Sequence, residues 1–190
     1  KLFEREFGGL TVLVGANNSG KSTILQGIHF GVAIAQSRRR LVDQENVADV
    51  GGASFSIAAQ QIIYTPLNDV LALGYGGNLT QTEGKHIQIE FEFNNGHHGE
   101  IKLRKGKNRN LAVVVSGGHV IGRIEDLAHP FSVYVPGLAG IAKHESFMAR
   151  GQLLRAVARG VVKCVGRYVL YALRSDEVKW GKFTAALKEV

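Results

Sequence analysis

Cysteine is almost absent from this sequence, which has one cysteine, Cys164, among its 190 residues. A single cysteine excludes an internal disulfide framework and a zinc cluster built from the thiolates of this chain alone. Proline is also rare, and 3 prolines beside 24 glycines exclude a collagen-like chain and a proline-rich linker protein. No secretory hydrophobic segment opens the sequence, so we expect a protein of the reducing cytoplasm. Because the first residue is Lys1 and not methionine, we expect the native polypeptide to be longer.

Long apolar runs are missing as well. The longest one near the start, residues 24–35, is interrupted by Gln26 and His29. It also falls well short of the roughly 20 apolar residues that a helix needs to cross a bilayer. We therefore expect no membrane partner.

The composition is that of a folded chain with an excess of positive charge. With 45% hydrophobic and 21% charged residues, the chain is not of the disordered class and can bury one sizeable core. Lysine and arginine number 23 against 16 acidic residues, which gives a formal net charge of +7. This balance suits a polyanionic partner such as nucleic acid, a nucleotide or an acidic protein surface.

The first part of the chain predicts a strand followed by a helix. Residues 10–14 form a short apolar burst between glycines, rich in β-branched side chains and typical of a buried strand. Apolar residues then recur at helical spacing from Ser22 to about Gln36. Gly27 and Gly31 lie four residues apart on this helix, which indicates close packing against a sheet.

Residues 86–122 change to a period of two, with a turn at Asn94-Asn95-Gly96. This alternation predicts an antiparallel meander of three strands, near residues 87–93, 101–105 and 111–115. Later elements predicted from the sequence are a buried strand at 131–135 and helices at 152–173 and 177–190.

The strongest motif is the octapeptide Gly-Ala-Asn-Asn-Ser-Gly-Lys-Ser at residues 15–22, which fits G-x-x-x-x-G-K-[ST] in full. Its glycines let backbone N–H groups surround phosphates, and the N-terminus of the following helix adds a positive dipole end. Lys21 supplies a point charge for the outer phosphates, and the Ser22 hydroxyl is a hard oxygen ligand for Mg²⁺. A glycine turn that only caps the helix through Ser22 is the alternative, which the strand–loop–helix context disfavours.

Residues 7–23, read as FGGLTVLVGANNSGKST, resemble the start of an ABC-type ATPase head. The resemblance is closest to the RecF, SMC and OLD-like group of AAA ATPases. It implies an α/β fold, in which a P-loop sheet with helices carries an antiparallel β subdomain, and it implies ATP and Mg²⁺ as cofactors. It also implies that Lys21 is catalytic, that Ser22 holds the metal and that a basic residue at Arg5 contacts the nucleotide. The nucleotide-binding residues are then Arg5, Gly15, Ala16, Asn17, Asn18, Ser19, Gly20, Lys21, Ser22 and Thr23.

The resemblance extends to later segments with weaker motifs. Residues 132–140 are similar to the strand that enters the Q-loop region of such heads, although no glutamine follows Val135. Residues 158–160 and 167–170, together with Trp180, resemble OLD-type ATPases of anti-phage defence systems. These similarities imply a role in DNA repair and maintenance or in anti-phage defence.

Two motifs of a complete head are not recognisable in the sequence. A Walker B strand should end directly in Asp-Glu, but Asp176-Glu177 follows two polar residues in a helical context. The signature motif is also missing, because Ser116-Gly117-Gly118 separates two β-branched runs and predicts a hairpin turn. We therefore expect residues 1–190 to be the N-terminal half of one head, whose hydrolysis requires downstream motifs and dimerisation. Its parts would be a P-loop lobe (1–85 and 131–150), a β-meander subdomain (86–122) and a helical segment (151–190).

Other function classes remain open at this stage. A nucleotide-sensing scaffold that holds or regulates a partner effector would use the same loop without turnover. A stand-alone P-loop kinase would need an acceptor pocket and a lid of arginines, and a GTPase would need an N-K-x-D motif that the sequence lacks.

Charged and histidine clusters give several further expectations. Arg155, Arg159, Lys163 and Arg167 recur every four residues, so on one long helix they would form a basic stripe for DNA or a protein effector. A head-to-head homo-oligomer is the other expected partner. Lys102 and Arg104 should pair with Glu90 or its neighbours across the meander, which leaves Lys105, Lys107 and Arg109 for a partner. Arg38, Arg39 and Arg40 are expected to be exposed at a helix C-terminus. His86, His97, His98 and His119 follow no metal-ligand spacing.

Overall fold

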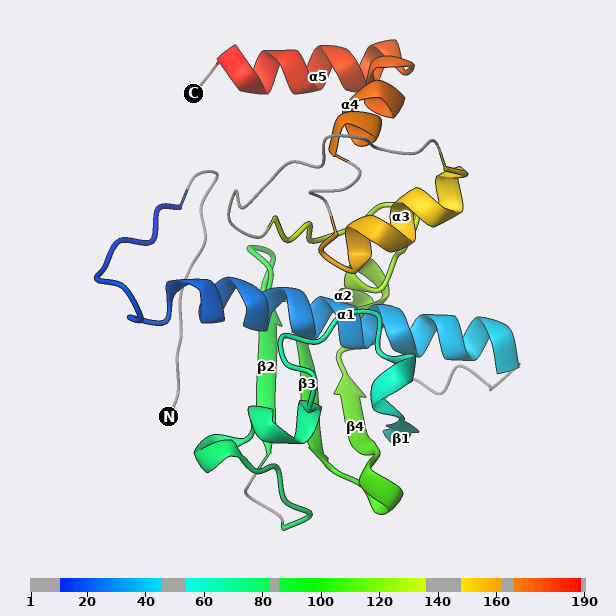
Figure 1. Cartoon of the computed structure of the whole chain (residues 1–190). Helices are drawn as coiled ribbons and strands as arrows, with labels where there is room; N and C mark the ends of the chain where they lie inside the picture. The colour runs from blue at the N-terminus through cyan, green and yellow to red at the C-terminus, as the bar shows by residue number, and fades with distance from the viewer. Residues whose placement is uncertain (1–10, 46–53, 83–85, 136–147, 162–165, 189–190) are drawn as a thin grey trace.

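The computed structural model of the chain describes residues 11–45, 54–82, 86–135, 148–161 and 166–188. Its elements form a mixed α/β fold, which confirms the fold class predicted from the sequence (Figure 1). The helices are α1 (Lys21–Glu45), α2 (Gly118–Ile124), α3 (Arg150–Ala158), α4 (Gly166–Arg174) and α5 (Glu177–Lys188). The strands are β1 (Ser54–Ile57), β2 (Ile87–Glu92), β3 (His98–Lys105) and β4 (Leu111–Ser116). Short 3₁₀ helices are η1 (Ala59–Gln61), η2 (Val70–Leu73), η3 (Tyr75–Gly77) and η4 (Lys107–Arg109).

The four strands form one antiparallel sheet in the order β1-β4-β3-β2. The meander of β2, β3 and β4 confirms the alternation in the sequence, and its first turn lies at Asn94-Asn95-Gly96 as predicted. Gly96 has a φ of 76° there, and its N–H donates to the Phe93 carbonyl at 2.8 Å. Strand β1 was not predicted, because its four residues alternate over too short a stretch to distinguish a strand from a loop. It pairs with β4 from a distant part of the chain, so that Ile57 lies opposite Leu111.

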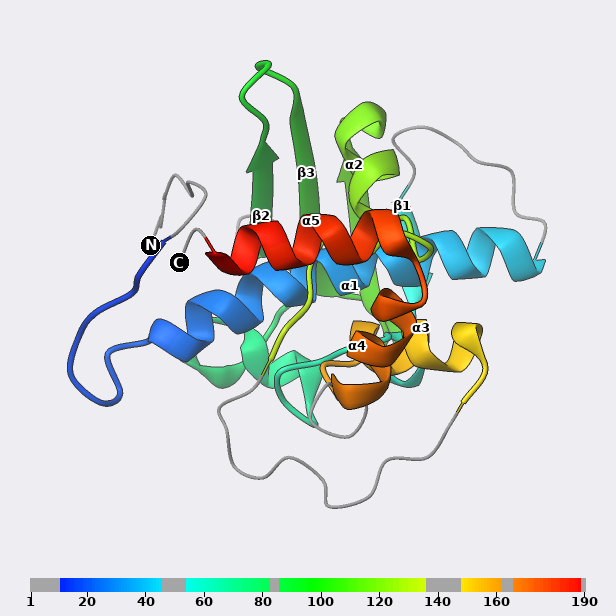
Figure 2. The ribbon, with the colours of Figure 1, turned by 90° about the horizontal axis from the view of Figure 1, so that it is seen from above.

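One face of this sheet is covered by α1, which crosses the strands in Figures 1 and 2. Phe30 and Ile34 of the helix pack with Ile101, Leu103 and Val113 of the sheet in one core. Gly31 allows a close approach at this contact, since a Cβ atom there would lie 3.1 Å from the Ile89 side chain and would require it to shift. The predicted close packing is thus confirmed at Gly31, whereas the corresponding position at Gly27 has no atom within 4 Å.

The helix α1 has 25 residues and continues past the end predicted near Gln36. The expectation that the three arginines lie exposed at a helix C-terminus was therefore wrong. Arg38 is buried, with its Nη1 at 2.8 Å from Oε2 of Glu125 at the end of α2. Arg39 is exposed and pairs with Asp43 one turn later, and Arg40 donates to the Gln61 carbonyl at 2.5 Å. The contacts of Arg38 and Arg40 hold the second half of α1 against neighbouring segments. The periodicity of apolar residues in the sequence gives no sign of such polar contacts.

The predicted hairpin turn at Ser116-Gly117-Gly118 was also wrong. Gly117 has a φ of 80° and is the N-cap of α2, whose Val120, Ile121 and Ile124 are buried. The β-branched side chains of this segment therefore enter the core from a helix and not from a strand. Tertiary burial overrides the weak strand preference of such residues.

Two short apolar segments predicted as buried strands do not form strands. Residues 11–14 pair with none of the described strands, and Val12 and Val14 are 72% and 90% exposed. Residues 131–135 are likewise outside the sheet, with Val133 and Val135 exposed. A strand needs a neighbour to accept its backbone hydrogen bonds, and the described residues supply none beside either segment.

The helix predicted at 152–173 is broken in two. Gly160, with a φ of 68°, follows Arg159, and its N–H donates to the Val157 carbonyl while Val161 N–H donates to Ala156. This pair of hydrogen bonds is a Schellman motif, which ends a helix at a left-handed glycine. In Figure 1, α3 lies above α1, and α4 and α5 lie above α3.

The basic stripe expected on one long helix therefore does not exist in that form. Arg155 lies in α3, and Arg159 is the residue at its C-terminal end. Lys163 lies outside the described residues, and Arg167 belongs to the separate helix α4. A spacing of four residues aligns side chains only within one continuous helix.

Candidate nucleotide-binding site

The motif at residues 15–22 forms a tight loop that leads into α1. Asn18 and Gly20 have φ values of 63° and 89°, and the Ser19 N–H donates to the Ala16 carbonyl at 3.3 Å. The helix begins at Lys21, and its first hydrogen bond joins the Ile24 N–H to the Gly20 carbonyl at 3.0 Å. Glycine allows the left-handed backbone at Gly20 without steric cost, and asparagine tolerates it at Asn18. The loop therefore has its compact shape from local sequence alone.

Lys21 folds back over this loop. Its Nζ donates to the carbonyls of Gly15 at 2.8 Å and Ala16 at 2.6 Å, and it lies 3.2 Å from Ser19 Oγ. Neutral oxygens of the loop therefore hold this ammonium group. It is thus already placed at the mouth of the loop, where the outer phosphates of a nucleotide would lie.

A larger residue at Gly15 would force the Ser19 side chain to move. A Cβ atom there would lie 2.7 Å from Ser19 Oγ. Ser22 and Thr23 are exposed on the first turn of α1, so their hydroxyls are accessible to phosphate and Mg²⁺. The residues present therefore fit a magnesium-bound nucleotide.

The structure brings together most of the residues predicted for this site. Ala16, Asn17, Asn18 and Ser19 are exposed around the loop, and Gly20 and Lys21 are half-buried. Arg5 lies outside the described residues, so its predicted contact with the nucleotide stays a prediction. The structure places residues 15–23 together in one loop and the first turn of α1, and their roles in binding a nucleotide also stay predictions.

Comparison with models of known protein families shows the family of the chain. A family model described as an AAA domain matches residues 3–126, a range that holds the phosphate loop, α1 and the whole sheet. The chain belongs to the AAA domain family. Searches of curated proteins and of solved structures find no match. Membership supports a P-loop ATPase in general, with nucleotide binding and usually Mg²⁺. None of the helices that the structure describes in this AAA domain combines the length and apolar content needed to span a membrane.

His29, in the middle of α1, joins three segments of this AAA domain that the sequence did not connect. Its Nδ1 lies 2.8 Å from Ser132 Oγ and its Nε2 lies 2.9 Å from the Ala158 carbonyl. Because a carbonyl only accepts, Nε2 carries the proton and Nδ1 accepts from the serine. Tyr64 and Tyr134 pack around the ring with centroids 4.7 Å and 5.8 Å away. The imidazole therefore ties the nucleotide-site helix to segment 131–135 and to the end of α3. The signal in the sequence was the polar residue inside the apolar run 24–35.

The buried position of His29 predicts a pH-dependent stability. Burial lowers the pKa of the imidazole, and the hydrogen bond to Ala158 opposes this effect. The unfolded chain, with a histidine pKa of about 6.5, therefore binds this proton at a higher pH than the folded chain does. The free energy of unfolding should then decrease as the pH falls below about 6.5. In urea unfolding at several pH values, His29→Gln is expected to lose less stability on acidification than the wild type. Equal losses in both proteins would contradict this assignment.

The remaining clusters do not form a second catalytic centre in the described ranges. No group of three or more His, Cys, Asp or Glu side chains is placed there to hold a metal ion, and His97 instead stacks on His119 at 4.8 Å. Lys102 lies across from Gln88, a neighbour of Glu90 as predicted, but its ion pair at 2.9 Å is with Glu100 of its own strand, so the predicted cross-strand ion pair was wrong. Side chains two residues apart share one face of a strand, which explains the pair with Glu100.

Proposed function

We propose that this AAA domain is the nucleotide-binding part of an ATP-hydrolysing head of the RecF, SMC and OLD-like group. A role in DNA maintenance or anti-phage defence is the biological setting that the sequence resemblance suggests. The observation that carries the proposal is the loop at residues 15–20 with Lys21 folded over it. A lysine at the mouth of a loop rich in backbone N–H groups is suited to bind the outer phosphates of a nucleoside triphosphate.

Each residue of the loop has a distinct part in binding. Backbone N–H groups of the loop and of the first turn of α1 would hold the phosphate oxygens. Lys21 would exchange its bonds to the Gly15 and Ala16 carbonyls for bonds to phosphate, which are stronger because the acceptor is charged. Ser22 would hold Mg²⁺, and this ion supplies neutralisation of phosphate charge when bound.

Hydrolysis needs groups beyond this loop, and the acidic pair that the sequence offers is engaged elsewhere. Asp176 precedes α5 and accepts from the Lys179 N–H at 3.1 Å, while its other oxygen lies 3.1 Å from Lys179 Nζ. These hydrogen bonds lower the pKa of the Asp176 carboxyl. Asp176 therefore caps a helix, as the helical context in the sequence indicated, and it does not end a strand. Phosphoryl transfer to water also needs a group that orients the attacking water.

Phosphate release from the purified 190-residue chain tests this proposal. Binding of Mg-ATP with turnover far below about 1 s⁻¹ is expected, because several kcal/mol of transition-state stabilisation would be missing. Turnover on the order of 1 s⁻¹ that is lost in Lys21→Ala would show that these residues hold a complete site. Retention of that turnover in Lys21→Ala would instead indicate a contaminating enzyme.

We further propose that turnover requires a head-to-head homo-oligomer, in which a second subunit completes the site. A DNA or protein effector contacting Arg155, Arg159, Lys163 and Arg167 also stays a proposal. Arg155 lies in α3, Arg159 caps its C-terminal end and Arg167 lies in α4, so such a partner would meet two helices and not one continuous face.

A further inference from the structure

A second cleft lies at the other end of the sheet from the turn between β2 and β3. It opens between the start of η1 and η2 on one side and the chain from η4 into β4 on the other, with a volume of about 500 Å³. This volume is within the range of about 300–1,000 Å³ that small-molecule sites occupy. We call it the amide cleft, because four of its polar lining residues carry side-chain amides. Its polar lining residues are Gln60, Asn68, Asp69, Asn108, Arg109 and Asn110.

The amides of this cleft are open to a ligand. The side chains of Gln60, Asn68 and Asn108 are exposed and make no hydrogen bond to any residue that the structure describes. Asn110 makes one long hydrogen bond, from Nδ2 to Ser56 Oγ at 3.4 Å. Each amide offers a donor and an acceptor side by side, the pattern that matches the edge of a nucleobase.

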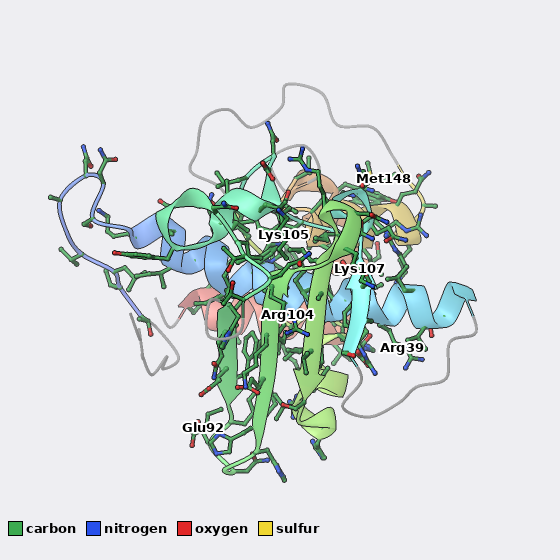
Figure 3. The ribbon with its side chains drawn as sticks, turned by 90° about the horizontal axis from the view of Figure 1, so that it is seen from below. Arg39, Glu92, Arg104, Lys105, Lys107 and Met148 are labelled. Atoms are coloured by element: carbon green, nitrogen blue, oxygen red, sulfur yellow. The ribbon has the colours of Figure 1, made fainter. Side chains whose placement is uncertain are left out.

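Positive charge gathers around the same cleft. Arg109 lines it and lies 3.6 Å from Asp69 on the opposite wall, where both side chains are mostly exposed. Arg104, Lys105 and Lys107 lie at the same end of β3 in Figure 3, and Glu92 lies at the far end of the sheet. An exposed ion pair at this distance contributes little to stability, so the Arg109 guanidinium can exchange its partner for an anion at small cost. A planar fork of donors of this kind suits phosphate.

The backbone of η4 is strained at the residue that carries this charge. Asn108 and Arg109 both have a positive φ, of 52° and 62°. Asparagine tolerates this region, but arginine seldom adopts it, and glycine would occupy it without steric cost. Such strain is often kept at binding sites, where it sets the direction of a functional side chain.

We propose that the amide cleft is a second nucleotide site, separate from the phosphate loop. Arg109 binds the phosphate, and the amides and Asp69 bind the base and the ribose hydroxyls. The ligand is either a free mononucleotide or the phosphorylated end of a nucleic-acid strand, which present the same chemistry. An acidic peptide fits less well, because its carboxylates offer Asp69 no hydroxyl group to accept from, whereas a ribose offers two.

Binding experiments in a Lys21→Ala background isolate this site, because the phosphate loop is then disabled. Calorimetric titrations would use AMP, GMP, CMP and UMP, and a short single-stranded oligonucleotide with a 5′-phosphate. Binding of at least one of these probes is expected to persist in Lys21→Ala and to weaken roughly tenfold to a hundredfold on adding Arg109→Ala. The double change Asn68→Ala/Asn108→Ala is expected to reduce the preference among bases.

Matched variants separate this site from general charge and from folding. Lys182→Ala removes an exposed cation from α5 and is expected to leave binding unchanged. Arg109→Gly relieves the left-handed backbone, so it should keep the midpoint of thermal unfolding while binding is lost. Preference for the oligonucleotide over all four mononucleotides would identify a strand end as the ligand, and the opposite preference would identify a free nucleotide.

Three outcomes would overturn the proposal. The first is no binding of any of these probes by the Lys21→Ala protein. The second is an equal loss in the Arg109→Ala and Lys182→Ala variants, which would indicate attraction to overall charge. The third is binding of polyglutamate with the same dependence on Arg109, which would indicate a site for acidic peptides.

Discussion

Replacement of Lys21 by alanine should lower the affinity for Mg-ATP at the phosphate loop by at least about a hundredfold. Lys21 Nζ is the only side-chain cation among residues 11–23. A hydrogen bond between charged groups contributes about 1.5–3 kcal/mol, so the loss of two such bonds to phosphate corresponds to at least about a hundredfold in affinity. The fold should survive, because the ammonium group contacts only Gly15, Ala16 and Ser19 within the loop itself. Calorimetry with ATP measures the affinity, and thermal unfolding checks the fold.

Lys182→Ala is the matched control for this change, since it removes the same charge from the exposed face of α5. Its ATP affinity should equal that of the wild type. Because the amide cleft can retain weak binding of nucleotides, ATP affinity has to be compared in Arg109→Ala and in Lys21→Ala/Arg109→Ala. Equal affinity in these two proteins would show that the loop at residues 15–22 is not the ATP site.

Removing one partner of the Arg38–Glu125 pair should have the largest effect on stability. The two side chains are 10% and 7% exposed, and their charged atoms lie 2.8 Å apart. Arg38→Met leaves the Glu125 carboxylate buried without this partner, which typically costs about 3–5 kcal/mol of unfolding free energy. Urea unfolding of the variant measures the loss.

The neighbouring pair provides the control for this prediction. Arg39→Met breaks the ion pair with Asp43, whose side chains are 45% and 53% exposed. An exposed pair contributes about 0–1 kcal/mol, so this variant should unfold almost like the wild type. The double variant Arg38→Met/Glu125→Leu should recover much of the loss, because no unpaired charge stays buried. Similar losses for Arg38→Met and Arg39→Met would contradict the buried role of Arg38.

The elements that were predicted correctly from the sequence are those whose structure depends on neighbouring residues in the chain. The phosphate loop needs glycine and asparagine at fixed positions, and Gly20 and Asn18 have the left-handed backbone that these types allow. The alternation in residues 87–93 predicted β2, because one face of that strand is half-buried and the other is exposed. The start of α1 at Lys21 followed from the same loop.

The parts that were missed depend on contacts between distant residues. The length of α1 depends on Arg38 meeting Glu125, and strand β1 exists because Ile57 pairs opposite Leu111. Nothing in the local pattern around either residue records such a partner. The break at Gly160 did have a local signal, a glycine after Arg159, but the basic spacing on both sides favoured one continuous helix.

The candidate site likewise has features that follow from local sequence and features that depend on distant contacts. Residue types predicted which groups would surround phosphate, but not that Lys21 would be held by the Gly15 and Ala16 carbonyls. The contacts of His29 with Ser132 and Ala158 join three separate segments, so a motif of fixed spacing could not reveal them.

The order of the strands also has a consequence for how the chain folds. Strands β2, β3 and β4 are joined by short turns, so their pairing closes small loops and costs little chain entropy. Strand β1 pairs with β4 across η1, η2, η3 and the whole hairpin of β2 and β3, and its pairing must close a much longer loop. The meander is therefore the part of the sheet that can assemble early and locally, and β1 gains its partner only once β4 is in place. Contacts of low sequence separation favour fast folding, so we expect the pairing of β1 to be the slower step in the assembly of the sheet.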